Sequence, residues 1–543
     1  MNRHCFLLLI SVLLLVLCVG CEKQEPVITS IYPRIGQMGE VVTIRGENFG
    51  DERDETSYVT IAGIAPTSSA YIDWRDGYIA LRVPEFGESG LVYVYREGAK
   101  SNAAIFSNQA GIPKPMPGDD VGVGPRITAV TPRSGPIGSV VTIQGHNFGA
   151  SREGSSVLFT WDAEASAAAP AELSGPTQVE VFDSDFGYEF WSEREIRVRV
   201  PDGAISGVLE VQTGRGSSRP EFFEVAEKPG TKMYRDKRRY AITYSVDIMA
   251  QEASGSNSLY LWVPRPVSSA SQRKVELLSR RTDPFVEDYR GAILYRLNDL
   301  RPGTRTGLAL SYLVEVYTVE TTVRPQQIRS SRGSPLETAY TLPSPRVPSD
   351  DGRIKAKAAE IVGREQNPYL KAQRIYQWLL REGGIQLEEV SGGAIEALER
   401  QETDAYGAAL LFCALARASG IPALPVAGVL VDRFPATGRH FWAEFWIEGF
   451  GWIPVDPALG AGAASTAFSL HADNAAFYFG NLDNQRITFS RGETTRSPMD
   501  PRGRVSTRER DFAMQTLWEE AVGGLESYSS LWSDVTINGV YAQ

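Results

Sequence analysis

Four short segments decide the fold of this chain, DAYGAALLF at 404–412, ARASGIP at 416–422, HFWAE at 440–444 and GWIPVDP at 451–457. The first two predict one helix from Asp404 to Ser419, because they are rich in Ala and Leu and end at Gly420 ahead of a proline. The last two alternate aromatic and polar residues, which predicts a β-hairpin with strands at 440–447 and 450–456. These residues therefore indicate an α+β domain.

The hairpin brings an imidazole and a carboxylate together. If its turn is centred on Glu448, His440 lies opposite Asp456 on the neighbouring strand. Gly449 and Gly451 could instead host a bulge, which would change this register. A carboxylate beside a histidine can fix the orientation of the ring for proton transfer.

These segments closely resemble the bacterial transglutaminase-like core, a papain-type fold with a Cys–His–Asp triad. The family pattern reads approximately G-D-C-x-x-x-A-x-L-F, A-x-x-R-A-x-G-I-P, H-x-W-x-E and G-W-x-x-x-D-P. The resemblance implies that His440 is the base and Asp456 the orienting acid, while Ala405 occupies the position of the cysteine. Because an alanine methyl cannot attack a carbonyl carbon, the chain keeps the residues that activate a thiol and lacks the thiol itself.

Large side chains accompany this remnant dyad. Trp442, Glu444 and Trp452 stand at the family's spacing and could line a cleft for a peptide or a sugar. Aromatic residues in such a hairpin are also common in protein cores. The sequence leaves both interpretations open.

No other residue is a convincing nucleophile. Outside the first 21 residues the only cysteine is Cys413, eight residues past Ala405. On one helix this separation is about 12 Å, and the neighbours of Cys413 are apolar, so we expect a buried, inert thiol. Thr403 and Tyr406 are poor substitutes, since a hydroxyl is far less nucleophilic than a thiolate at neutral pH. We therefore expect the cysteine-type chemistry to be lost.

The first 21 residues predict export. Arg3 precedes an apolar run from Phe6 to Val19, and Gly20 stands before Cys21, which is typical of a secretory signal. The segment resembles a bacterial lipoprotein signal, which implies removal of residues 1–20 and a lipid on Cys21. A single-pass membrane helix is the alternative, but the run is short for it. We expect a chain anchored by lipid to a bacterial membrane, either the outer membrane or one that faces the periplasm.

Composition excludes some partners. The net charge is −11 and the isoelectric point is about 5.2, which argues against nucleic acid as a ligand. No residue pattern indicates a metal or a cofactor, and His146 is interpreted as a surface residue. The mature chain cannot form an internal disulfide, so its stability must come from ordinary hydrophobic cores.

An internal repeat organises the N-terminal half. VVTIRGENFG at 41–50 returns as VVTIQGHNFG at 140–149. Strand-like alternation broken by Gly, Pro and Asn predicts a small β-sandwich in each copy. The repeats resemble the IPT/TIG domain, an immunoglobulin-like module, over 26–108 and 125–227. The segment 109–124 between them is rich in proline and is expected to be a semi-rigid linker.

The remaining segments complete a multidomain chain of two all-β sandwiches, a β-domain and an α+β core. Residues 230–328 predict the β-domain and 350–460 the core, whose further helices are expected at 351–363 and 368–382. A C-terminal extension follows at 461–543. In it we expect closing strands at 477–483 and 486–489, and a helix near 508–524.

Two classes of function follow from these observations. The first is a non-catalytic lipoprotein that binds or scaffolds a protein, a peptide or a glycan at the cell envelope. The second is a transglutaminase or cysteine-peptidase relative with an unrecognised nucleophile. The alanine at position 405 favours the first class.

The lipoprotein signal predicts that Cys21 carries the lipid. Metabolic labelling with radioactive palmitate should mark the wild-type chain and leave Cys21→Ser unlabelled, because the acceptor thiol is gone. Cys18→Ser is the matched control and should keep the label. Equal labelling of wild type and Cys21→Ser would contradict the assignment.

Overall fold

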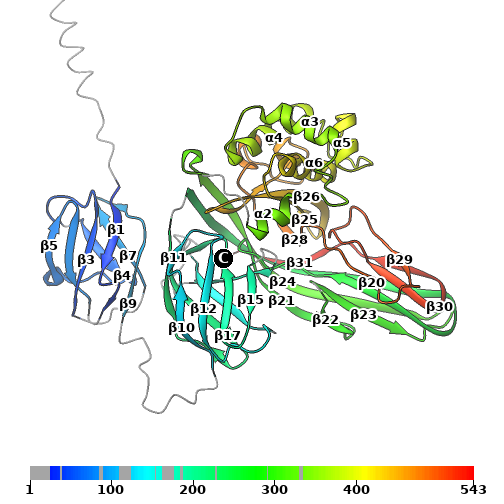
Figure 1. Ribbon diagram of the computed structural model, residues 1–543, viewed down its shortest axis with the longest axis horizontal. Coiled ribbons are helices and arrows are strands. Elements are labelled where there is room, and N and C mark those ends of the chain that lie inside the picture. The colour runs from blue at the N-terminus through cyan, green and yellow to red at the C-terminus, as the bar shows by residue number, and fades with distance from the viewer. Residues whose placement is uncertain are drawn as a thin grey trace, which may run out of the picture. The chain divides into compact units, whose positions relative to one another are not determined.

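The computed structural model describes residues 25–542, apart from 37–38, 55, 85–89, 109–123, 153, 162–176, 184–186, 227–228, 290 and 329–333. The signal segment with Cys21, nearly all of the linker and most of the Ala- and Pro-rich part of the second repeat lie outside the described residues. The described residues fall into two compact units, the first up to residue 108 and the second from residue 124 onward (Figure 1).

The first unit is a β-sandwich. Its strands are β1 Val27–Tyr32, β2 Ile35–Gly36, β3 Val41–Glu47, β4 Tyr58–Ile61, β5 Tyr71–Arg75, β6 Tyr78–Arg82, β7 Gly90–Arg96, β8 Ala99–Lys100 and β9 Ala104–Asn108. One sheet has the order β1-β3-β6-β5 and the other β2-β9-β7-β4, with β8 paired to β7. Alternate residues such as Ile44 of β3 and Val59 of β4 are fully buried, as expected where two sheets pack face to face.

The second repeat has the same architecture. Its strands are β10 Arg126–Thr131, β11 Ser134–Gly135, β12 Val140–His146, β13 Ser156–Trp161, β14 Thr177–Glu180, β15 Tyr188–Trp191, β16 Glu195–Arg199, β17 Ala204–Thr213, β18 Gly216–Ser217 and β19 Glu221–Val225. Val130 pairs with Ile143 as Ile31 pairs with Ile44 in the first copy. Both repeats are immunoglobulin-like sandwiches, and His146 is exposed, which confirms these predictions.

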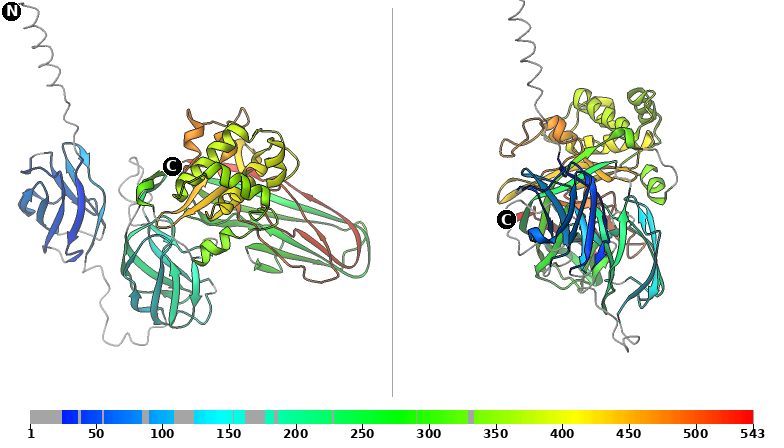
Figure 2. Two further views of the ribbon diagram at one scale, coloured as in Figure 1. Left: turned by 45° about the horizontal axis from the view of Figure 1, so that its top comes forward. Right: turned by 90° about the vertical axis from the view of Figure 1, so that its left-hand side faces the viewer.

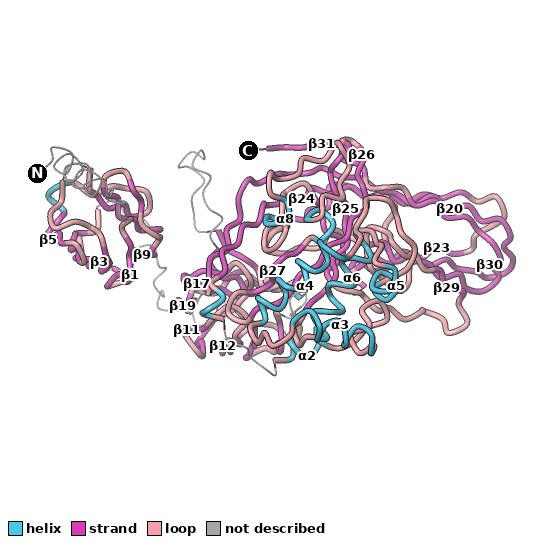
Figure 3. Tube along the Cα trace, turned by 90° about the horizontal axis from the view of Figure 1, so that it is seen from above, coloured by secondary structure: helices cyan, strands magenta, loops and turns pink. Residues whose placement is uncertain are grey.

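A long antiparallel sheet follows the second sandwich. Its strands are β20 Gly230–Pro264, β21 Gln272–Arg280, β22 Val286–Tyr289, β23 Ala292–Asn298, β24 Arg305–Val323, β29 Arg504–Ser506, β30 Glu519–Trp532 and β31 Thr536–Ala542. The order is β21-β24-β20-β23-β22, with β30 and β31 also paired to β20 and β29 paired to β30. Part of this sheet extends away from the helices as an arm, as Figures 2 and 3 show.

The helix expected near 508–524 is wrong, because residues 508–518 form turns and loop and the rest of the segment begins β30 at Glu519. Two adjacent glycines, Gly523 and Gly524, disfavour a helix. In the strand they let β30 approach β20 closely, since a Cβ at Gly524 would lie 1.9 Å from the carbonyl oxygen of Ser254. Distant pairing therefore overrides the local pattern.

The α+β core has one sheet with helices on both of its faces. Its elements are α2 Pro335–Thr341, α3 Gly352–Val362, α4 Pro368–Glu382, α5 Ala394–Arg400, α6 Ala405–Ala418, β25 Ala423–Arg433, β26 Ala436–Ile447, β27 Gly451–Val455, α7 Pro457–Gly460, α8 Asn474–Phe477 and β28 Arg486–Arg491. The sheet order is β27-β26-β25-β28, with α3, α4 and α6 on one face and α2 on the other. The second expected closing strand is present as β28. The first is wrong, because a short helix and two isolated bridges occupy residues 474–482.

The second sandwich packs directly against the core. Lys232 of β20 donates hydrogen bonds to both carboxylate oxygens of Asp202, each at 2.7 Å, and to the carbonyl of Trp452 at 2.6 Å. The main-chain N–H of Trp452 donates to the same carboxylate at 3.1 Å. Gly138, with φ of 85°, lies so close to Trp446 that a Cβ would be 2.4 Å from its ring. Three parts of the chain therefore share one buried interface.

This interface predicts a large loss of stability in Lys232→Met. The substitution leaves the buried carboxylate of Asp202 without its counter-charge, which should lower the free energy of unfolding by about 3–5 kcal/mol. Urea unfolding of the purified chain, followed by tryptophan fluorescence, measures the change. Arg502→Met is the control and should leave the transition unchanged, since the Arg502 side chain is 90% exposed. Equal transitions in the two variants would contradict the interpretation.

Candidate functional site

The first turn of α6 presents Ala405. The N-cap residue is Asp404, whose Oδ1 accepts a hydrogen bond from the main-chain N–H of Gly407 at 3.0 Å. Gly407 is required for space, because a Cβ there would lie 2.1 Å from Oγ1 of Thr403. Ala405 is the first residue of the helix and is half-buried. The free N–H groups of this turn form a positive helix end, which is where a thiolate would be stabilised.

His440 and Asp456 are hydrogen-bonded to each other. Nε2 of His440 lies 2.8 Å from Oδ2 of Asp456, and both side chains are buried. The expected register is wrong, however: Ala443 pairs with Val455, so the next step along the hairpin brings Asp456 level with Trp442. The turn is centred on Gly449 and contains two glycines with positive φ. The two side chains still meet because diagonal neighbours on one sheet face are within reach.

Asp456 is the most heavily bonded residue of the site. Nη1 of Arg486 donates to its Oδ2 at 3.0 Å, and the N–H of Leu459 donates to its Oδ1 at 3.0 Å. Burial alone would raise the pKa of Asp456, but His440, Arg486 and the Leu459 N–H stabilise the carboxylate and lower its pKa to about 2. The carboxylate is therefore ionised at neutral pH.

The sequence did not predict that Arg486 belongs to the site. Its Nη2 donates to Asp483 at 2.6 Å, and its guanidinium lies 4.9 Å from the ring of Trp442. It stands in β28, whose alternation predicted a strand but gave no sign that this side chain reaches Asp456. An arginine is identified as a partner only when the sheet order is known.

The free nitrogen of His440 decides what the pair can do. Within the described part of the chain, Nδ1 makes no hydrogen bond, so Nδ1 is the atom available to take a proton. The next residue, Phe441, packs against Tyr406 with ring centroids 4.9 Å apart, which brings the first turn of α6 beside β26. That Ala405 faces the imidazole remains a prediction.

The regions described above match two known families. Residues 355–457 match the Transglutaminase-like superfamily, and residues 26–108 and 125–164 match the IPT/TIG domain. The chain contains a transglutaminase-like core. Two IPT/TIG domains precede it.

Individual relatives are distant. An uncharacterized protein of Haemophilus influenzae is 25% identical over 269 residues, which cover 41% of this chain and 69% of the relative. A cyclomaltodextrin glucanotransferase of Paenibacillus macerans is 27% identical over 86 residues, 16% of this chain and 12% of that enzyme.

The solved structures that resemble this chain superpose on it with low TM-scores. A Cytophaga hutchinsonii protein described as a "Putative Cysteine Protease" is 15% identical with a TM-score of 0.39, over 57% of this chain and 93% of that one. SGBP-B, from a xyloglucan utilization locus of Bacteroides uniformis, is 12% identical with a TM-score of 0.14, over 55% and 100%. These overlaps are too low to carry an argument about function.

Cys413 of the transglutaminase-like core is inert. The thiol is completely buried inside α6, and burial raises its pKa to about 12. A thiol with this pKa has almost no thiolate at neutral pH, so it cannot replace a nucleophile at position 405.

Trp442, Glu444 and Trp452 do not line an open cleft. The two tryptophans are 1% and 3% exposed, and Glu444 is 9% exposed and paired with Arg491 at 2.5 Å. The hairpin face that carries them packs against the second IPT/TIG domain and the long sheet. The expectation of a cleft here is wrong, because a neighbouring domain covers the aromatic face.

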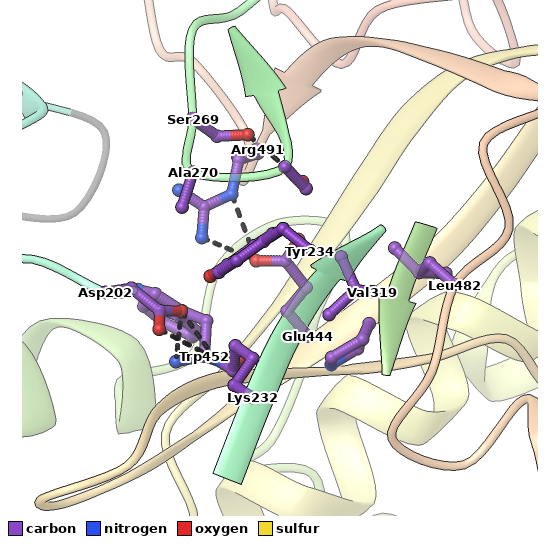
Figure 4. A pocket seen from close by; sticks show the side chains of 12 residues that line it. Asp202, Lys232, Tyr234, Ser269, Ala270, Val319, Glu444, Trp452, Leu482 and Arg491 are labelled. Carbon is purple, nitrogen blue, oxygen red and sulfur yellow. Dashed lines mark hydrogen bonds and ion pairs between the residues drawn. The ribbon is translucent and has the colours of Figure 1, made fainter. Parts of the chain in front are cut away.

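A small pocket lies on this face, and Glu444 and Trp452 are among the residues that line it. Its volume is about 30 Å³, and it lies between the Asp202–Lys232 and Glu444–Arg491 ion pairs (Figure 4). Such a volume suits a single water molecule. The aromatic face is therefore a domain interface.

Among the described residues, no group of three or more His, Cys, Asp or Glu side chains is placed to bind a metal ion. Over the same residues, no helix combines the length and the apolar character needed to cross a membrane.

The buried dyad predicts a specific acid sensitivity. The depressed pKa of Asp456, about 2 against an ordinary 3.8, stabilises the fold above about pH 4, and this contribution is lost as the pH falls through about 2. Asp456→Asn should therefore lower the free energy of unfolding by about 3 kcal/mol at neutral pH, with a smaller difference from wild type near pH 2. Urea unfolding at several pH values measures both effects.

The exposed Asp283 provides the matched control, and Asp283→Asn should follow the wild type at every pH. A constant gap between Asp456→Asn and wild type across the acid range would contradict the assignment of the low pKa to Asp456.

Proposed function

We propose that this chain is an exported, lipid-anchored protein whose transglutaminase-like core binds a ligand at the cell envelope without turning it over. The ligand class is an extended peptide or an envelope polymer. One observation carries the proposal: Ala405 occupies the first position of α6, where the family's nucleophilic cysteine belongs.

The absence of a thiol removes the covalent route. Without it no acyl-enzyme can form, and the imidazole of His440 can at best assist a water molecule. The hydrogen bonds of Asp456 to His440 and Arg486 are nonetheless present. A site that keeps its buried polar frame and lacks its nucleophile is better suited to binding than to acyl transfer.

The two IPT/TIG domains take different roles in this proposal. The second packs on the core through Asp202 and Gly138, so it belongs to the binding unit. The first stands in sequence between the proposed anchor at Cys21 and the proline-rich segment 109–124. We assign it the role of spacer between the membrane and the binding unit.

Binding without turnover is tested with the purified chain and isolated envelope fractions. We expect specific retention of one fraction and no amidase, peptidase or transamidase activity. Ala405→Trp should abolish retention, because an indole fills the place of the methyl beside β26. Arg502→Trp adds the same side chain at an exposed position and should retain the fraction.

The alternative is an enzyme with an unrecognised nucleophile. It predicts turnover of an envelope amide by the wild-type chain, lost in His440→Ala or in Cys413→Ser. Such turnover would overturn the proposal. Equal retention by Ala405→Trp and Arg502→Trp would show that binding, if present, does not use this site.

A further inference from the structure

A short segment between β29 and β30 crosses the region where α6 meets β26. We call residues 508–512 the strap, and the contact of the first turn of α6 with β26 the α6–β26 junction. Within the strap, Nε of Arg508 donates to Asp511 at 2.7 Å, and Asp511 is 2% exposed. The strap is therefore a packed segment with an internal ion pair.

Arg510 fastens the strap to the helix side of the junction. Its guanidinium is paired with the carboxylate of Asp404, the N-cap of α6, and donates to the carbonyl oxygens of Val390 and Gly392. It also lies 4.5 Å from the ring centroid of Tyr406. Arg510 therefore contacts the residues on both sides of Ala405.

Asp511 and Phe512 fasten the strap on the other side. Nε of Arg439, the residue before His440, lies 3.3 Å from Oδ1 of Asp511. Phe512 is buried against Phe489 of β28 and Trp518, at 4.8 Å and 5.7 Å between ring centroids. The strap thus bridges the two elements that carry position 405 and the histidine.

The backbone of the strap is adapted to this position. Arg510 has φ of 55°, a left-handed conformation that costs energy for a residue with a Cβ. The ion pair and the hydrogen bonds of its guanidinium offset that cost. If those contacts are lost, the strained backbone favours release of the segment.

We propose that the strap is a lid on the α6–β26 junction, which bars macromolecules from Ala405 and His440 until Arg510 leaves Asp404. His440 is 4% exposed while the lid is in place. The lid controls access alone, whether the site behind it binds a ligand or catalyses a reaction.

The test uses a reporter thiol in the full-length chain, Ala405→Cys. The tryptic peptide 401–417 contains position 405 and Cys413, and tandem mass spectrometry distinguishes alkylation at the two sites. Rates are measured with iodoacetamide and with a polyethylene-glycol maleimide, each divided by the rate in the urea-unfolded chain. The rates are compared at a pH high enough that the reporter thiol is fully ionised and the rate no longer depends on pH. A change in the pKa of that thiol on removal of Arg510 then does not alter the comparison.

With the strap closed, the large reagent should be slowed much more than iodoacetamide. Adding Arg510→Gly should raise the rate of the large reagent by about tenfold or more, because the strap opens more often. Glycine is chosen since it adopts φ of 55° without strain. Arg502→Gly, in the exposed loop that precedes β29, should leave both rates unchanged.

Cys413 reports unfolding in the same experiment, because it is completely buried in α6. Labelling at 405 alone indicates an opened strap, whereas labelling at both sites indicates unfolding. If Arg510→Gly unfolds, Arg439→Ala decides, since it removes the contact of Asp511 with β26 and leaves the Arg508–Asp511 pair and the α6 N-cap intact. Unchanged rates of the large reagent in a folded Arg510→Gly or Arg439→Ala chain would overturn the proposal.

Discussion

The core depends on the hydrogen bonds and ion pairs of one buried carboxylate, that of Asp456. It joins β26 through His440, β28 through Arg486 and the start of α7 through Leu459. A carboxylate with no exposed surface is tolerated only when its charge is matched and its oxygens are bonded. Loss of Arg486 or His440 would leave this buried charge less well matched, so the network contributes to stability even if the site catalyses nothing.

Under the proposed loss of the nucleophile, this network explains why the frame of the site is still assembled. Ala405 is half-buried and contributes little polar chemistry, so a cysteine can be replaced there at small cost. His440 and Asp456 are buried and bonded, so their replacement is expensive. Selection against unfolding alone is sufficient to preserve them. Their presence is therefore weak support for catalysis, whereas the residue at position 405 is informative.

Local patterns predicted the elements whose signals are local. The Ala- and Leu-rich run and Gly420, with φ of 78°, place α6 almost as the sequence indicates. The repeat sandwiches follow from strand alternation and turn residues. The predicted hairpin register was wrong by two residues, because alternation fixes the faces of the strands and leaves the position of the turn near Gly449 undetermined.

Local sequence patterns did not predict the features that depend on residues far apart in the chain. Burial of Trp442 and Trp452 needs the second IPT/TIG domain, and the partnership of Arg486 with Asp456 needs the sheet order. The C-terminal strand was mistaken for a helix because its partner, β20, is far away in sequence: Glu519 pairs with Leu261. Non-local pairing leaves little trace in a single window of sequence.

That pairing has a consequence for biogenesis. The sheet opened by β20 at Gly230 lacks two of its neighbours until β30 and β31, residues 519–542, have been synthesised. Closing a loop of this length is slow, and the unpaired edge of β20 is exposed to aggregation in the meantime. A chain of this design gains from a holding factor that covers this edge during synthesis, until the whole sheet can close.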